Sequence, residues 1–221
     1  MRTIRVTGKG QLKVHPDMTR ITMELKGSSR EYGETLEKSA KETEQLKDIL
    51  APFGFDRMDL KTLRFDVETL YESYQEKKVW KERFNGYQYT HVMKVEFESD
   101  NQRLGKVLYA LAHCNLHPEF RISYTVKDPE ATKNELLGKA VQDAMAKAGV
   151  LTGAAGLSLG EIQSIDYSWG RVDFEVRPMD RDLMMCKEMA PMEPGCSYDL
   201  DIEPDDIEVE DTVTVVWEVR R

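Results

Sequence analysis

The chain has 221 residues, of which 40% are hydrophobic and 32% are charged, and its formal net charge at pH 7 is −9. This composition is ordinary for a soluble globular protein that buries a sizeable core. The acidic balance argues against a general binder of nucleic acid or of anionic membranes, because such proteins usually carry a basic face.

The N-terminal part predicts two strands followed by a long helix. Residues 3–14 and 18–26 alternate between apolar and polar side chains, and Pro16-Asp17 between them is a turn signal, so we expect a β-hairpin. Gly27-Ser28-Ser29 then precedes apolar residues at helical spacing, which predicts a helix that is capped there and ends near Phe53.

The middle part predicts three strands and a short helix. Residues 60–70 and 87–97 alternate as strands, and the polar and aromatic stretch between them predicts a hairpin arm with a loose tip. Asp100 is a suitable N-cap for a helix that stops near Asn115. Residues 120–126 alternate again and predict a strand that leads to the longest helix.

Asp128 to Gly156 predicts a long central helix with both ends marked. Asp128 is a good N-cap, Pro129 suits the first helical position, and Gly156 suits a left-handed end. The apolar stripe is Leu136, Leu137, Ala140, Val141, Ala144, Met145 and Ala148. Gly149 and Gly153 weaken this prediction, because each costs roughly 1 kcal/mol inside a helix relative to Ala.

The C-terminal part predicts a strand at 159–169, an irregular stretch at 170–198 and a final strand at 207–219. The order ββα-ββαβ-αββ indicates an α+β fold with two subdomains, each a mainly antiparallel sheet packed on one face by helices. We expect an outer subdomain from 1–57 plus 127–221, with ββα and αββ halves, and a central ββαβ subdomain from 58–126.

Several motifs suggest chemistry but fit a structural role better. Thr7-Gly8-Lys9-Gly10 resembles a phosphate loop, yet its glycines lie inside a strand and do not open a helix. His113, Cys114 and His117 resemble zinc ligands without an evident fourth.

Two further stretches carry metal-ligand residue types. The thioether and thiol groups that could favour Cu(I) are Met179, Met184, Met185, Cys186, Met189, Met192 and Cys196, and a mobile or assembly-ordered loop is the simpler interpretation. The acidic residues that match a calcium-loop spacing are Asp199, Asp201, Glu203, Asp205 and Glu210, but Pro204 stands where such a loop needs Gly.

An aromatic set in the predicted arm indicates a contact surface. Tyr71, Tyr74, Trp80, Phe84, Tyr87 and Tyr89 lie among Lys77, Lys78, Lys81 and Arg83. Stacking with positive charge can bind single-stranded nucleic acid, but the acidic chain favours a protein–protein interface. The residues that we predict at an interface are Tyr71, Tyr74, Trp80, Phe84, Tyr87, Met184, Met185 and Met189.

The sequence contains no motif of a known catalytic centre, and we assign no catalytic, cofactor-binding or metal-binding residue. No run of about 18 apolar residues predicts a membrane-spanning helix. The N-terminus shows no signal-peptide pattern, and three scattered cysteines form no disulfide framework, so we expect a cytoplasmic location.

The chain resembles the SIMPL-domain family, a bacterial family of largely unknown function. The matching segments, in order, are Ile4–Gly10, Pro16-Asp17, Thr62, Gly86-Tyr87, the set Ala140, Asp143, Ala144, Lys147 and Ala148, then Gly156-Leu157 and Leu159-Gly160. Gly149 and Gly153 depart from the family's helix formers, and many relatives are exported with a signal peptide.

The resemblance implies an α+β fold with two subdomains and a tendency to self-associate, and it supplies no catalytic residue. We therefore expect a non-catalytic, self-associating scaffold or interaction protein, a homo-oligomer that binds no nucleic acid. The alternative is a small-ligand or metal-binding module that uses the cleft between the subdomains. The identity of a ligand or other partner and the subunit count stay open.

Overall fold

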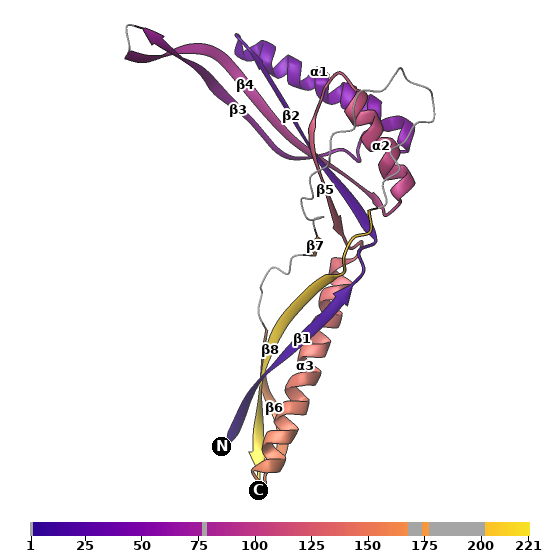
Figure 1. Cartoon of the computed structure of the whole chain (residues 1–221). Helices are drawn as coiled ribbons and strands as arrows, with labels where there is room; N and C mark the ends of the chain where they lie inside the picture. The colour runs from indigo at the N-terminus through magenta and orange to yellow at the C-terminus, as the bar shows by residue number, and fades with distance from the viewer. Residues whose placement is uncertain (1, 77–78, 168–173, 177–201) are drawn as a thin grey trace. The chain divides into compact units, whose positions relative to one another are not determined.

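The computed structural model describes residues 2–76, 79–167, 174–176 and 202–221 (Figure 1). Its elements in chain order are β1 (Thr3–Val14), β2 (Met18–Ser29), α1 (Tyr32–Leu50), the 3-10 helix η1 (Ala51–Phe53), β3 (Lys61–Glu76), β4 (Val79–Glu98), α2 (Asn101–His113), β5 (Glu119–Thr125), α3 (Pro129–Ala154), β6 (Ser158–Tyr167), β7 (Glu175–Val176) and β8 (Ile207–Arg220).

The strands form two sheets, one with the order β1-β8-β6 and one with the order β3-β4-β2-β5-β7. The pairs β1–β8, β6–β8, β2–β4, β3–β4 and β5–β7 are antiparallel. Helices pack against each sheet, so the predicted α+β class with two sheet-and-helix subdomains is confirmed.

The chain divides into two compact units. Unit 1 consists of Met1–Asp17, Tyr124–Val176 and Pro204–Arg221, and unit 2 consists of Met18–Ser123 and Arg177–Glu203. The sequence prediction instead grouped residues 18–57 with the outer part of the chain. The difference arises because β2 pairs with β4 along its whole length and α1 packs on β2 and β4.

The predicted β1–β2 hairpin is wrong. β1 pairs with β8 at the other end of the chain, from Thr3 opposite Glu218 to Val14 opposite Ile207, while β2 pairs with β4. Strand alternation shows which face of a strand is buried, but it does not identify the partner strand, so a short connection suggested a hairpin that does not form.

The start of α1 also differs from the prediction. Gly27-Ser28-Ser29 lies in β2, and the N-cap of α1 is Glu31, which makes no side-chain cap hydrogen bond. Gly27 is instead needed opposite Tyr89, because a Cβ at Gly27 would overlap the Tyr89 ring. The small residue therefore makes room for a buried aromatic side chain on the neighbouring strand.

In unit 2, α1 and α2 supply one layer of the core and the sheet supplies the other. The buried core residues are Ile21, Met23, Leu25, Leu46, Leu50, Phe55, Tyr89, Met93, Val95, Phe97, Leu104, Val107, Leu108 and Leu111. Asp100 is the N-cap of α2 as predicted, since its carboxylate accepts from the amides of Gln102 and Arg103.

In unit 1, α3 lies along β1 and β8 and covers one face of the three-stranded sheet (Figure 1). Asp128 caps the helix through the amide of Ala131, and Gly156 adopts the left-handed conformation with φ 64°, so both predicted ends are confirmed. The helix continues through Gly149 and Gly153 to Ala154. Met145, predicted in the buried stripe, is instead exposed.

Candidate interaction surface

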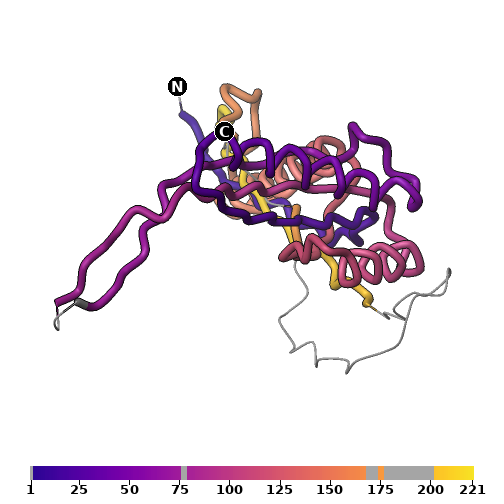
Figure 2. The backbone as a smooth tube through the Cα atoms, turned by 90° about the horizontal axis from the view of Figure 1, so that it is seen from above, coloured from indigo at the N-terminus to yellow at the C-terminus, as the bar shows by residue number. Residues whose placement is uncertain are grey.

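The candidate site is the outer part of the β3–β4 hairpin, which we call the arm (residues 70–76 and 79–86). β2 pairs with β4 only from Tyr87 to Glu98, so the arm is a two-stranded ribbon without a third strand among the described residues. Figure 2 shows the ribbon continuing past the N-terminal end of α1. The predicted hairpin arm is therefore present in the structure.

A bulge marks the base of the arm. The β3–β4 register shifts between Leu70 and Tyr71, where Leu70 pairs with Gly86 and Tyr71 pairs with Phe84. Gly86 has φ 122°, and a Cβ there would overlap the carbonyl of Ser29 at the end of β2. Glycine is needed at this position both for the backbone conformation and for the close approach of β2.

The two faces of the arm differ in chemistry. Cross-strand partners point to the same face of a ribbon, and side chains alternate along each strand. Tyr71 pairs with Phe84 and Gln75 pairs with Trp80, which places the three aromatic side chains on one face, called here the aromatic face. Glu72, Tyr74, Lys81 and Arg83 lie on the other face, called here the charged face.

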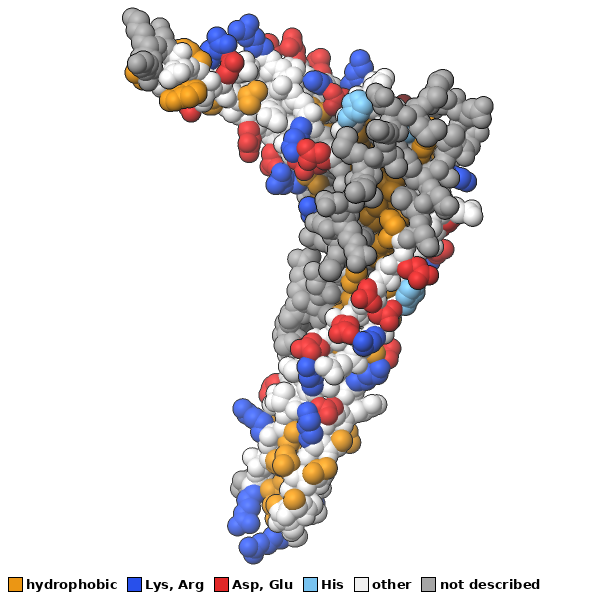
Figure 3. Space-filling model, viewed as in Figure 1, with side chains coloured by type: hydrophobic (Ala, Val, Ile, Leu, Met, Phe, Trp, Pro, Cys, Tyr) orange, Lys and Arg blue, Asp and Glu red, His pale blue; other side chains and the backbone are white. Residues whose placement is uncertain are grey.

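The aromatic face continues toward the start of α1. The ring centroids of Tyr71 and Phe84 are 6.4 Å apart, those of Phe84 and Tyr87 are 5.4 Å apart, and those of Tyr87 and Tyr32 on α1 are 5.2 Å apart, all edge to face. Trp80 lies farther out and has 71% of its surface exposed. Hydrophobic side chains are visible on the arm at the upper left of Figure 3.

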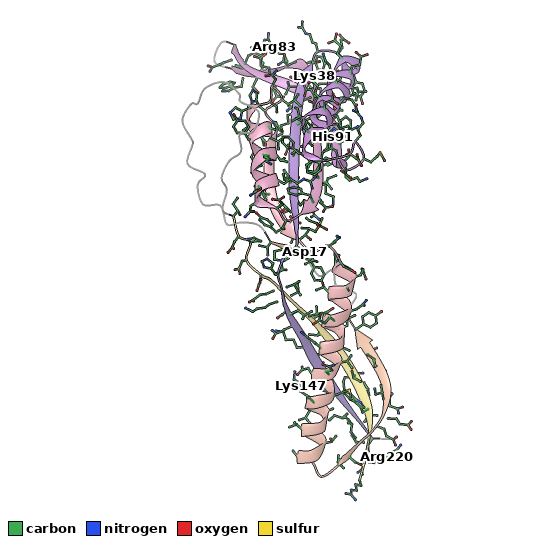
Figure 4. All side chains as sticks on the ribbon, turned by 90° about the vertical axis from the view of Figure 1, so that its right-hand side faces the viewer. Asp17, Lys38, Arg83, His91, Lys147 and Arg220 are labelled. Atoms are coloured by element: carbon green, nitrogen blue, oxygen red, sulfur yellow. The ribbon has the colours of Figure 1, made fainter. Side chains whose placement is uncertain are left out.

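The charged face is held by an ion pair. The Arg83 guanidinium donates to the Glu72 carboxylate from Nε at 2.9 Å and from Nη2 at 2.6 Å, and it lies 5.8 Å from the centre of the Tyr74 ring. This hydrogen bond raises the pKa of Arg83. Figure 4 labels Arg83 on the arm. This cross-strand pair lies on the charged face, and the register places Tyr71, Phe84 and Trp80 on the opposite face.

The structure separates the predicted interface residues. Tyr71, Trp80 and Phe84 share the aromatic face, Tyr87 extends it, and Tyr74 lies on the charged face. The predicted interface residues Met184, Met185 and Met189 lie outside the described residues. The sequence indicated an aromatic cluster, but the division into faces depends on the register and the bulge.

His91 and Tyr89 of β4 are buried and make polar contacts that the sequence analysis did not predict. His91 lies between Thr43 of α1, at 3.1 Å from Nδ1, and Thr62 of β3, at 2.9 Å from Nε2. Burial lowers the pKa of His91, and the positive charge of Lys47 lowers it further. Tyr89 donates to Glu42, and burial raises the pKa of its hydroxyl. Each group has partners within the fold, so a structural role accounts for it.

The glycine pair in β1 serves packing. A Cβ at Gly8 would overlap the backbone of Ala140 and Ala144, and one at Gly10 would overlap the carbonyl of Leu136. The two glycines therefore let α3 lie directly on the strand, which agrees with the structural interpretation of this motif.

The carboxylate of Asp143 on α3 also bonds the backbone of β1. The Asp143 carboxylate accepts from the Lys9 amide at 2.7 Å and from Lys147 Nζ at 2.6 Å, and these bonds lower the pKa of Asp143 (Figure 4 labels Lys147). The Asp and Lys of the central helix thus hold β1 against α3.

The predicted metal motifs receive no support from the described part of the chain. Within it, no group of three or more His, Cys, Asp and Glu side chains is placed to hold a metal ion. His113 lies near the Tyr109 carbonyl and stacks on its ring, and Cys114 lies near the carbonyl of Leu111. The Met and Cys cluster of 179–196 and the first two residues of the calcium frame lie outside the described residues.

A family model named SIMPL, protein of unknown function (DUF541), matches residues 4–217. The chain belongs to the SIMPL family. The match includes the glycine pair of β1, the Asp143–Lys147 pair of α3 and the whole arm. Two of the segments that carried the resemblance, the glycine pair of β1 and the alanine-rich part of α3, thus pack on each other in unit 1.

Among curated proteins, this SIMPL chain is similar to the 26 kDa periplasmic immunogenic protein of Brucella abortus (strain S19), with 26% identity over 163 residues. The corresponding protein of Brucella melitensis biotype 1 is 25% identical over 163 residues. Each alignment covers 73% of this chain and 65% of the relative, which is less than two thirds of the relative's length.

The names of these relatives place them in the periplasm. They give no support to the cytoplasmic location that the sequence analysis expected. No helix in the described part of this SIMPL chain is long and apolar enough to span a membrane.

Proposed function

We propose that this SIMPL protein is a non-catalytic interaction protein that self-associates through the aromatic face of its arm, and that it works in the periplasm. The location follows the names of the relatives. The single observation that carries the self-association is the arm itself, a two-stranded ribbon with its aromatic rings on one exposed face.

The low stability expected of a two-stranded arm without a partner supports this proposal. A two-stranded ribbon alone is at best marginally stable in water, and it gains stability when a further layer or strand packs on it. The ring contacts from Tyr71 through Phe84 and Tyr87 to Tyr32 make a continuous apolar surface and not isolated exposed residues. Such surfaces mark interaction sites, and aromatic residues are enriched in them.

Four of the titratable groups with shifted pKa values support a non-catalytic protein. His91 is held by two threonine hydroxyls, Tyr89 by Glu42, Glu96 by Lys94 and Arg20, and Asp143 by Lys147 and the Lys9 amide. Catalytic groups with perturbed pKa values usually gather in a cleft where substrate can reach them. These four groups instead have partners that secure helix to sheet or strand to strand.

Sedimentation velocity across a range of protein concentrations tests the proposal. We expect the wild-type protein to associate, and we expect Trp80→Ala to weaken association at least about tenfold, because a large aromatic anchor typically contributes about 2 kcal/mol or more to an interface. Tyr74→Ala is the matched control, because it removes a tyrosine from the charged face of the same ribbon. A wild-type protein that stays monomeric at every concentration contradicts the proposal.

The alternative predicted from the sequence, a small-ligand or metal-binding module, stays a prediction. A thermal-shift screen against metabolites and metal ions tests it, and a raised melting temperature with one class of compound would favour it over the interaction protein.

A further inference from the structure

The sheet of unit 1 has two edges, and a side chain from α3 occupies part of one of them. β1 and β6 are the outer strands of the order β1-β8-β6. At the β1 edge, the Asp143 carboxylate accepts from the Lys9 amide at 2.7 Å, and Lys147 Nζ donates to the same carboxylate. A side chain that bonds an outward backbone amide discourages a further strand from pairing there.

The β6 edge is different, because apolar side chains on the core side of the sheet stay half exposed. Ile162, Ile165 and Tyr167 pair with Trp217, Val215 and Val213 of β8, so both sets point to the face that α3 covers. The three β8 residues are buried under α3. Ile162 is 48% exposed, Ile165 is 47% exposed and Tyr167 is 44% exposed, because α3 packs mainly on β1 and β8.

The other face of β6 contains Ser164 and one carboxylate, Asp166. Asp166 pairs with Thr214, whose hydroxyl contacts Thr7 on the side of the sheet away from α3. β6 also contains Glu161 and no Lys or Arg. A strand that joined this edge would fit best with apolar residues toward the α3 side and basic residues toward Asp166.

The arm contains a strand with that pattern. The outer edge of β4 in the arm has no strand partner among the described residues, since β2 pairs with β4 only from Tyr87 onward. Trp80 and Phe84 point to the aromatic face, whereas Lys81 and Arg83 point to the charged face. Four of the five positions from 80 to 84 therefore fit that pattern, and the exception is Glu82, which lies on the aromatic face between the two rings.

We propose that β4 of the arm in one copy adds as a further strand to β6 of a second copy, with Trp80 and Phe84 on Ile162, Ile165 and Tyr167 and with Lys81 beside Asp166. This inference rests on the proposed self-association and names the surface that receives the arm. Backbone hydrogen bonds between these two edges, which pair with no further strand among the described residues, supply affinity, and the side chains on each face set the register. The contact is heterologous, because each copy uses two different surfaces.

A complementation experiment tests this contact. Trp80→Ala damages the arm and Ile165→Asp damages the receiving strand, so each variant alone should associate at least about tenfold more weakly than wild type. A mixture of the two variants still contains one intact pair of surfaces, namely the arm of the Ile165→Asp copy and the β6 of the Trp80→Ala copy. We therefore expect mixed dimers, detected by sedimentation velocity with a fluorophore on one variant.

The controls and outcomes separate this inference from the proposed function. Met58→Asp places the same charge at an exposed apolar residue outside both surfaces and should leave association unchanged. Circular dichroism of each variant verifies folding. If wild type associates but the mixture stays monomeric, or if Ile165→Asp associates normally, the arm meets another surface, such as a second arm, and this inference falls while the proposed function stands. A monomeric wild type overturns both.

Discussion

At the residue scale, His91 shows how the fold holds one histidine neutral. Its two ring nitrogens lie within hydrogen-bond distance of Thr43 and Thr62, and the Phe65 ring lies edge-on at 5.0 Å between centroids. A neutral imidazole offers one donor and one acceptor to the two hydroxyls, which serve in either role. Protonation turns both ring nitrogens into donors in a buried place near Lys47.

The lowered pKa of His91 predicts a loss of stability in acid. The unfolded chain binds a proton near the ordinary histidine pKa of about 6.5, whereas the folded chain binds it only at lower pH. The stabilising effect is therefore complete above about pH 6.5 and decreases as the pH falls toward the folded-state pKa, by at most about 1.4 kcal/mol per pH unit. Urea unfolding at pH 7.5 and pH 5.5 measures it.

His91→Gln is the comparison for this effect, because glutamine keeps a donor and an acceptor but does not titrate. Other groups with shifted pKa values, such as Glu96, change the free energy of unfolding with pH in both proteins. We expect wild type to lose more stability than the variant between pH 7.5 and pH 5.5. Equal losses would show that His91 does not contribute to the acid sensitivity.

At the element scale, glycines of α3 and of the strand beneath it have opposite surroundings. Gly149 lies inside the helix, and a Cβ added there would have no neighbour within 4 Å, whereas Gly8 of β1 lies directly against the α3 backbone. A helical glycine with open space costs stability through the entropy of the unfolded chain. A glycine in tight contact with backbone atoms permits packing that no other residue allows.

These surroundings predict effects of opposite sign for the same substitution. Gly149→Ala should raise the free energy of unfolding by about 0.5–1 kcal/mol, because alanine favours the helix and meets no neighbour. Gly8→Ala should lower it by about 1–3 kcal/mol, since its Cβ would push α3 away from the strand. Chemical denaturation of both variants measures the two changes, and a destabilised Gly149→Ala would contradict the role given to helix propensity.

At the scale of the whole molecule, the two units differ in how the chain builds them. Apart from residues 202–203, the described part of unit 2 lies within Met18–Ser123, and its core cluster draws on no described residue outside that segment. Unit 1 joins the two ends of the chain, because β1 pairs with β8 across nearly the full length of the sequence. The core of unit 2 therefore lies within one segment of the chain, whereas the core of unit 1 needs both ends of the chain.

This difference predicts that a fragment of residues 18–123 folds alone. It keeps α1, α2, β2, β3, β4 and most of β5, together with the whole unit 2 core. We expect a cooperative thermal transition by circular dichroism. Residues 1–17 alone should stay unfolded, because β1 needs β8 and α3 to cover its apolar face. A fragment 18–123 without a cooperative transition would show that unit 2 depends on the rest of the chain.

Much of the element order follows from the sequence for a local reason. Alternation along strands, the Asp128 cap and Gly156 at the end of α3 act within a few residues, so the sequence specifies them directly. The aromatic composition of the arm is likewise visible in the sequence. The SIMPL family follows from ordered matches along the chain, and the match from 4 to 217 shows it.

Pairing between distant segments was decided only by the tertiary structure. The partner of β1 lies at the other end of the chain, and alternation is the same whichever strand lies alongside, so the sequence wrongly indicated a hairpin. The division of the arm into an aromatic and a charged face depends on a bulge between Leu70 and Tyr71. The exposure of Ile162 and Ile165 arises because α3 covers β1 and β8, and a pattern within β6 alone does not show which neighbour covers it.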